Sequence, residues 1–196
     1  MIYIFIILLL VVIVFNCYNN YLENADINII EGIDGNNYYV RNNNDQDLAV
    51  KILCEIRQKI KQLINLIEEN NTLDEEYKIY KENINIIKNK IDDVKIKETP
   101  KTSNYTSYSV NKGEELFLCI RSKKTNEIHD INDLLYVAIH EIAHIGCPEI
   151  GHTNLFFKIN LYLLKKAIEF NLYNYDNYNN NPKEYCGIDL NNSLLN

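Results

Sequence analysis

Three of the four histidines, His140, His144 and His152, lie within thirteen residues of one another. His140 and His144 are four residues apart, so a helix would place both imidazoles on one face. Glu141 directly follows His140 and completes the HExxH pattern of zinc hydrolases. In that pattern two imidazoles bind Zn²⁺, and the glutamate takes the proton of the metal-bound water. The pattern predicts Zn²⁺ as the cofactor and Glu141 as a general base.

The third metal ligand must come from outside the motif helix. A catalytic zinc site has three protein ligands and an open fourth position for water. His152 lies just beyond the bend at 146–151 and is the expected third ligand, with Glu149 and Cys147 in that bend as alternatives. If Cys147 joined the three histidines, the site would instead be a closed structural one with four ligands.

Other residues near the motif could serve the same chemistry. The strand expected over 115–120 could bind an extended peptide by strand addition if it lies at a sheet edge. Tyr185 is a candidate for holding an oxyanion. His129 is interpreted as a surface or capping residue.

The elements that must position these groups can be read from local patterns. Asp130 and Asp133 provide a cap and early negative charge for the motif helix, and Gly146 with Pro148 ends it. The same patterns predict a β-hairpin over 105–110 and 115–120, with its turn at 111–113, and a last helix over 154–170.

Two amphipathic segments precede this region and predict a helical hairpin over 48–94, interrupted at Asn70-Asn71-Thr72. We expect the hairpin to pack on the domain behind it or to form a short stalk. Self-association through its helices is a further option.

Residues 1–15 carry no polar group except one tyrosine hydroxyl, which predicts a single-pass membrane anchor over 1–18. No small-x-small cleavage site follows, which argues against a cleaved signal peptide. The chain would then reside in a viral or host membrane, with its orientation undetermined. Residues 19–47 are rich in Asn and Asp and predict a polar tether.

The net charge of −7 and the pI of about 5.1 argue against a nucleic-acid partner, because phosphate binding needs a basic face. The five cysteines are widely spaced and contain no CxxC pair. They predict mostly reduced thiols in a cytosol-like compartment rather than a disulfide framework.

The segments that carry these motifs resemble the WLM/SprT-like zinc metallopeptidases, in particular versions encoded by large DNA viruses and some protists. The resemblance covers about residues 104–190 and rests on Asn111–Glu114, Leu118–Arg121, His129–Asn132, His140–His144, Gly151–Thr153, Phe156-Phe157 and Pro182–Gly187. It implies a minimal zincin with His140, His144 and His152 as zinc ligands. The separation of His144 from His152 in the sequence is longer than in the soluble DNA-repair members of these families. The action of those members on DNA-bound proteins is not expected of this chain.

Together, these observations predict an α+β protein: a minimal zincin-like domain over 95–196 with a small sheet, a motif helix and a C-terminal helix. The helical hairpin and the membrane helix precede it. The leading hypothesis is a membrane-anchored zinc peptidase that acts on a protein or peptide substrate. The alternative is a catalytically inactive, membrane-tethered scaffold with a structural zincin fold.

Overall fold

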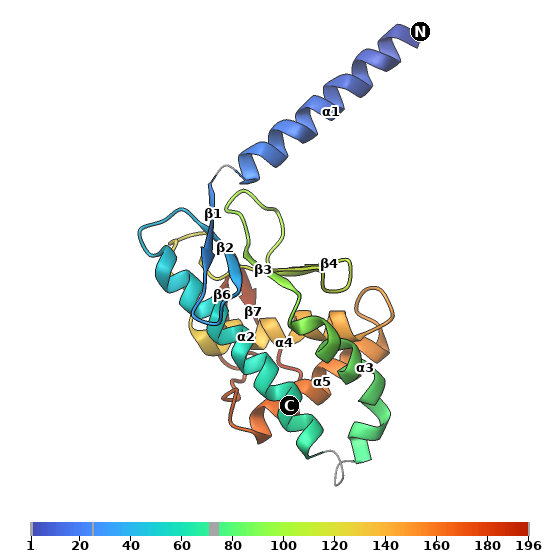
Figure 1. Ribbon diagram of the computed structural model, residues 1–196, viewed down its shortest axis with the longest axis vertical. Helices are drawn as coiled ribbons and strands as arrows, with labels where there is room; N and C mark the ends of the chain where they lie inside the picture. The colour runs from blue at the N-terminus through green and yellow to red at the C-terminus, as the bar shows by residue number, and fades with distance from the viewer. Residues whose placement is uncertain (1, 25, 71–74, 196) are drawn as a thin grey trace.

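The computed structural model describes residues 2–24, 26–70 and 75–195 (Figure 1). Within them the chain has an α+β fold with five helices and two small sheets, which confirms the predicted fold class. The helices are α1 (Ile2–Asn24), α2 (Gln46–Glu69), α3 (Glu75–Ile91), α4 (Ile131–Gly146) and α5 (Asn154–Glu169). The strands are β1 (Ile27–Glu31), β2 (Asn37–Arg41), β3 (Lys95–Glu98), β4 (Tyr108–Val110), β5 (Glu115–Leu118), β6 (Lys183–Tyr185) and β7 (Ile188–Leu190).

The main sheet has the strand order β1-β2-β3-β5-β4. The inner pairs β2–β3 and β3–β5 are parallel, whereas both outer pairs are antiparallel. Successive side chains of a strand point to opposite faces, and one face carries the buried Ile96, Leu116 and Leu118. This face lies against the helices.

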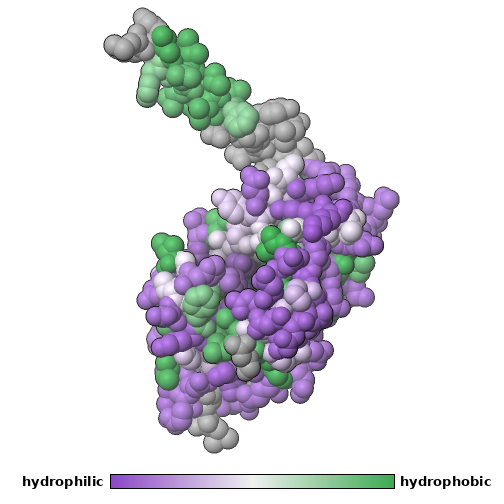
Figure 2. All heavy atoms as spheres, turned by 180° about the vertical axis from the view of Figure 1, so that it is seen from behind, coloured by the Kyte–Doolittle hydropathy of each residue, from purple (hydrophilic) through white to green (hydrophobic). Residues whose placement is uncertain are grey.

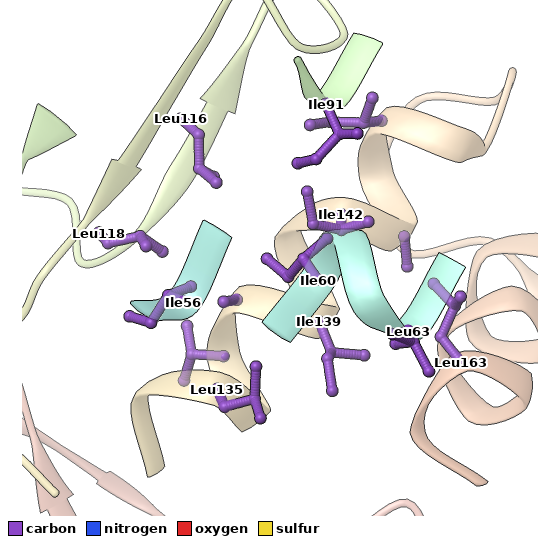
Figure 3. Packing of buried hydrophobic residues seen from close by; sticks show 14 of the residues in the cluster. Ile56, Ile60, Leu63, Ile91, Leu116, Leu118, Leu135, Ile139, Ile142 and Leu163 are labelled. Atoms are coloured by element: carbon purple, nitrogen blue, oxygen red, sulfur yellow. The ribbon is translucent and has the colours of Figure 1, made fainter. Parts of the chain in front are cut away.

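The core lies between that face and helices α2 and α4 (Figure 3). Leu116 and Leu118 of β5 point toward Ile56 of α2 and toward the apolar side of α4. Packing in the core fixes one side of α4, the helix that carries the HExxH motif.

The predicted helical hairpin is confirmed as α2 and α3, although the Asn71-Thr72 part of its expected break lies outside the described residues. Its buried residues belong to the same hydrophobic cluster as those of α4 and α5. The hairpin therefore packs on the domain behind it and does not form a separate stalk.

Residues 27–41 fall inside the stretch expected to be a polar tether, but they form β1 and β2. Tyr38 and Val40 are fully buried, so this segment belongs to the core. Apolar residues alternate in these strands, but the many Asn and Asp residues around them make the segment read as a polar linker. Strand β3 and the β6–β7 hairpin were likewise not predicted, because strands of three or four residues carry too little pattern.

The prediction of a single-pass membrane anchor over 1–18, and with it the membrane localisation, is wrong. Across the described residues, no helix has both the length and the apolar character needed to cross a bilayer. The apolar run of α1 ends at Phe15, and at about 1.5 Å per residue it covers roughly 21 Å of a hydrocarbon core about 30 Å thick. Helix α1 extends away from the sheet (Figure 1), and its residues Ile4–Phe15 form an exposed apolar stretch beside a mostly polar surface (Figure 2).

The expectation of mostly reduced thiols needs one correction, since Cys119 and Cys186 form a disulfide with a Cα–Cα distance of 6.0 Å. Cys54 and Cys147 are free and buried, and the side chain of Cys17 lies outside the described residues. The bonded cysteines are 67 residues apart in sequence, so only the tertiary fold brings them together.

A candidate metal centre

The three histidines of the predicted site converge in space. Nε2 of His152 lies 3.1 Å from Nε2 of His140 and 3.2 Å from Nε2 of His144. In the part of the chain that the structure describes, these three residues form the one group of His, Cys, Asp and Glu side chains with metal-site spacing.

The spacing fits a zinc ion well. Tetrahedral zinc with Zn–N bonds of about 2.0–2.1 Å holds its ligand nitrogens roughly 3.3 Å apart, close to both separations. Because the three imidazoles share one small region, their lone pairs would repel one another without a cation. The donor set, three imidazoles, is one that zinc prefers.

Phe156 of helix α5 packs against all three imidazoles. Phe156 is fully buried, stacks on His144 with 4.0 Å between ring centroids, and contacts the rings of His140 and His152. Thr153 caps α5 by accepting from the Phe156 backbone N–H. Gly151, with a φ of +81°, makes the turn that brings His152 back toward α4.

The electrostatics keep the motif imidazoles neutral, as metal ligation requires. Burial, and after it the neighbouring His144 and His152, lower the pKa of His140 to about 3. Burial also lowers the pKa of His144 to about 4, with His152 and the Lys112 ammonium acting in the same direction.

Glu141 is 6% exposed and lies beside the histidines on α4. Burial raises the pKa of its carboxyl to about 7, and a hydrogen bond from the Ser109 backbone N–H partly opposes this rise. A carboxylate with a pKa close to neutrality is well matched to proton transfer at neutral pH.

The histidines and Glu141 line a cleft of about 630 Å³. Its other wall is formed by residues 106–109 and by the turn at Asn111 and Lys112. The neighbouring edge strand is β4, whereas β5 lies inside the sheet between β3 and β4. The strand predicted over 115–120 therefore cannot accept an added peptide strand, and β4 takes that position.

Two supporting residues were not foreseen from the sequence. Lys112 donates from Nζ to the backbone oxygens of Cys147 at 2.8 Å and Glu149 at 2.5 Å, which ties the hairpin turn to the loop before His152. The Asn160 amide lies 3.3 Å from Nδ1 of His140, on the side away from the other histidines. Only Asn160 carried a sequence signal, a polar residue on the apolar face of α5.

The alternative ligands lie elsewhere. Cys147 is buried at the end of α4, and Glu149 is exposed, so neither joins the histidine group. His129 is half-buried and accepts from the Cys186 backbone N–H in the turn between β6 and β7, whereas the cap of α4 is Asp130. Tyr185, the candidate for holding an oxyanion, is only 1% exposed and does not line the cleft.

No family model matches the chain. It is 41% identical to "Uncharacterized protein R325" of Acanthamoeba polyphaga mimivirus over 163 residues, which is 83% of this chain and 81% of that protein. It is also 40% identical to "Uncharacterized protein 136R" of Invertebrate iridescent virus 6 over 96 residues, 48% of this chain and 49% of the relative.

Among solved structures, the chain is similar to Wss1 from Saccharomyces cerevisiae, with a TM-score of 0.47 and 16% sequence identity. That similarity covers 66% of this chain and 84% of Wss1. The sequence relation to the mimivirus protein is much stronger and extends over most of both chains. The chain belongs to the family of viral proteins that includes this mimivirus relative.

Proposed function

We propose that this protein is a zinc-dependent endopeptidase of the WLM/SprT-like kind, with His140, His144 and His152 as zinc ligands and Glu141 as general base. The observation that carries the proposal is the convergence of three imidazole Nε2 atoms beside a buried glutamate, on the wall of a cleft. The pKa of about 7 for Glu141 supports its role in proton transfer.

When bound, Zn²⁺ would supply Lewis acidity, which lowers the pKa of a coordinated water toward about 7 and polarises a carbonyl group. Glu141 accepts the proton of the attacking water at its carboxylate. It then delivers that proton to the leaving amine nitrogen as the peptide C–N bond breaks. Burial of Glu141 keeps bulk water from solvating the carboxylate during both transfers.

The substrate is proposed to be an extended protein segment that adds to β4. This strand is three residues long, lies at the sheet edge and borders the cleft. An added strand would gain main-chain hydrogen bonds and place one peptide bond at the histidines.

The inactive scaffold is the less favoured alternative. A scaffold needs no cavity at the motif helix, whereas here a cleft reaches His140, Glu141 and His144. A closed structural zinc site is also not favoured, because neither Cys147 nor Glu149 lies within ligand distance of the group.

The test uses the full chain and its Glu141→Gln variant, measured for zinc content and for cleavage of an unstructured protein such as casein. We expect one zinc per chain in both proteins and a loss of cleavage of about 10²–10⁴-fold in the variant. Gln is the matched control because it keeps the size of Glu but cannot take a proton. A folded parent chain without zinc, or zinc without cleavage, would contradict the proposal.

A further inference from the structure

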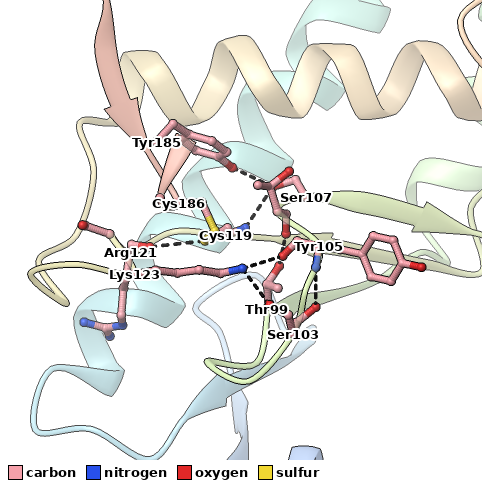
Figure 4. The surroundings of a disulfide bond; sticks show 12 residues. Thr99, Ser103, Tyr105, Ser107, Cys119, Arg121, Lys123, Tyr185 and Cys186 are labelled. Atoms are coloured by element: carbon pink, nitrogen blue, oxygen red, sulfur yellow. Dashed lines mark hydrogen bonds between the residues drawn. A yellow bond between two sulfur atoms is a disulfide. The ribbon is translucent and has the colours of Figure 1, made fainter. Parts of the chain in front are cut away.

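Ser107 lies close to the Cys119–Cys186 disulfide (Figure 4). Its Oγ lies 2.6 Å from the hydroxyl oxygen of Tyr185 and accepts a hydrogen bond of 2.9 Å from the Cys119 backbone N–H. Ser107 is also one of the residues that line the cleft with His140 and Glu141. One serine oxygen therefore joins a buried polar network to the candidate site.

The direction of the Ser107–Tyr185 hydrogen bond follows from burial. Tyr185 is 1% exposed, so its O–H proton must find an acceptor within the protein. Within the described part of the chain, the groups that hydrogen-bond this hydroxyl are Ser107 Oγ and the Cys119 backbone N–H. The N–H can only donate, so Ser107 Oγ is the acceptor. Tyr185 therefore donates and Ser107 accepts.

A serine hydroxyl has two acceptor sites and a single proton. The Cys119 N–H and the Tyr185 O–H fill both acceptor sites of Ser107 Oγ. The remaining proton of Ser107 has no acceptor within this network, and the residue borders the cleft. We propose that Ser107 donates this proton in a hydrogen bond to the carbonyl oxygen of the peptide bond that is cleaved.

This inference rests on the proposed function, because it assigns a catalytic residue to that reaction. As the water oxygen bonds to the carbonyl carbon, the π electron pair of the carbonyl moves onto its oxygen. Ser107 stabilises the resulting negative charge by a hydrogen bond and keeps its own proton. Two incoming donors polarise the Ser107 hydroxyl and make it a stronger donor.

The surrounding contacts hold Ser107 in this arrangement. The Cys119–Cys186 disulfide connects the residue whose N–H contacts Ser107 to the neighbour of Tyr185. His129 accepts from the Cys186 N–H and lies against the Tyr185 ring, with 5.1 Å between centroids. A donor fixed in advance stabilises developing charge at little reorganisation cost. Tyr185 thus serves as a positioning residue and does not itself reach the substrate.

The test compares Ser107→Ala with the parent in zinc content, melting temperature, kcat and KM. We expect kcat to fall by about 10²–10³-fold, with zinc content unchanged and KM within about threefold, as for other oxyanion donors. The matched control is Ser122→Ala. Ser122 Oγ also accepts backbone N–H groups, from Lys124 and Thr125, but it does not line the cleft.

If Ser107→Ala keeps kcat within threefold while Glu141→Gln is inactive, the inference is overturned and the proposed function stands. If the parent binds zinc but cleaves nothing, both are overturned. If Ser107→Ala does not fold, the same measurements on Tyr185→Phe test the inference instead. A fall in kcat of about tenfold at unchanged zinc content supports the proposal, because one orienting hydrogen bond is lost. An unchanged kcat in that variant overturns it.

Discussion

Asn160 should control how tightly zinc binds, although it is not itself a ligand. A metal at Nε2 of His140 requires the ring proton on Nδ1, and that proton needs an acceptor. The Asn160 amide lies 3.3 Å from Nδ1 and is 3% exposed, so water does not compete for this position. The amide atom that faces Nδ1 is Nδ2, and a 180° turn of the amide group would place its oxygen there instead. In that orientation the amide would fix both the tautomer and the orientation of His140.

Replacing Asn160 by Leu removes the acceptor while keeping similar volume. We expect the zinc dissociation constant to rise by about 10–100-fold, the usual effect of losing such a partner. This corresponds to about 1.4–2.8 kcal/mol of binding free energy. The matched variant is Asn160→Asp, which keeps an acceptor oxygen and should bind zinc at least as tightly as the parent.

The assay is a competition titration of the metal-free protein against a chromogenic zinc chelator at neutral pH. Circular dichroism of each metal-free variant checks that the fold is intact. The reasoning about Asn160 is refuted if the Leu variant binds zinc within twofold of the parent. An equal loss of zinc affinity in the Leu and Asp variants would also refute it, because the Asp variant keeps an acceptor oxygen and the Leu variant does not.

Two further predictions concern stability. The metal-free protein should lose stability as the pH falls from about 6.5 toward 4, because the pKa values of His140 and His144 are lowered from 6.5 to about 3 and 4. Glu141, whose pKa is raised from 4.5 to about 7, acts oppositely and partly offsets this loss. Urea unfolding at pH 7.5 and 5.0 should therefore show a loss of stability at the lower pH in the parent. It should show a gain in the His140→Gln/His144→Gln double variant, where only the contribution of Glu141 remains. Removing the disulfide with Cys119→Ala/Cys186→Ala frees a loop of 67 residues and should lower the free energy of unfolding by about 4 kcal/mol. A loss below about 1 kcal/mol in the same urea titration would contradict the chain-entropy argument.

Much of the candidate site followed from local sequence. The spacing of His140 and His144 defines one helix face wherever that helix lies, and Asp130 and Gly146 marked its ends. The turn at 111–113 also formed as predicted, with residues at positive φ. Each of these features depends on interactions within a few residues, which the sequence displays directly.

The sequence misled where an element depends on distant partners. Strand β3 has only four residues, and its parallel pairing with β2 and β5 joins segments far apart in the chain. The tether expected over 19–47 failed for the same reason, because Tyr38 and Val40 are buried only after α2 packs on them. The anchor over 1–18 failed on length, because the apolar run is too short to cross a bilayer.

The sequence by itself determined the HExxH pattern and the helix that carries it, because four-residue spacing places two side chains on one face of a helix. Only the tertiary structure decided that His152, and neither Glu149 nor Cys147, joins His140 and His144. It also brought Tyr185 and the Cys119 N–H to the same oxygen of Ser107. The contact between Ser107 and Tyr185 joins residues 78 positions apart, and its geometry is set by how the sheet and helices pack rather than by any local pattern.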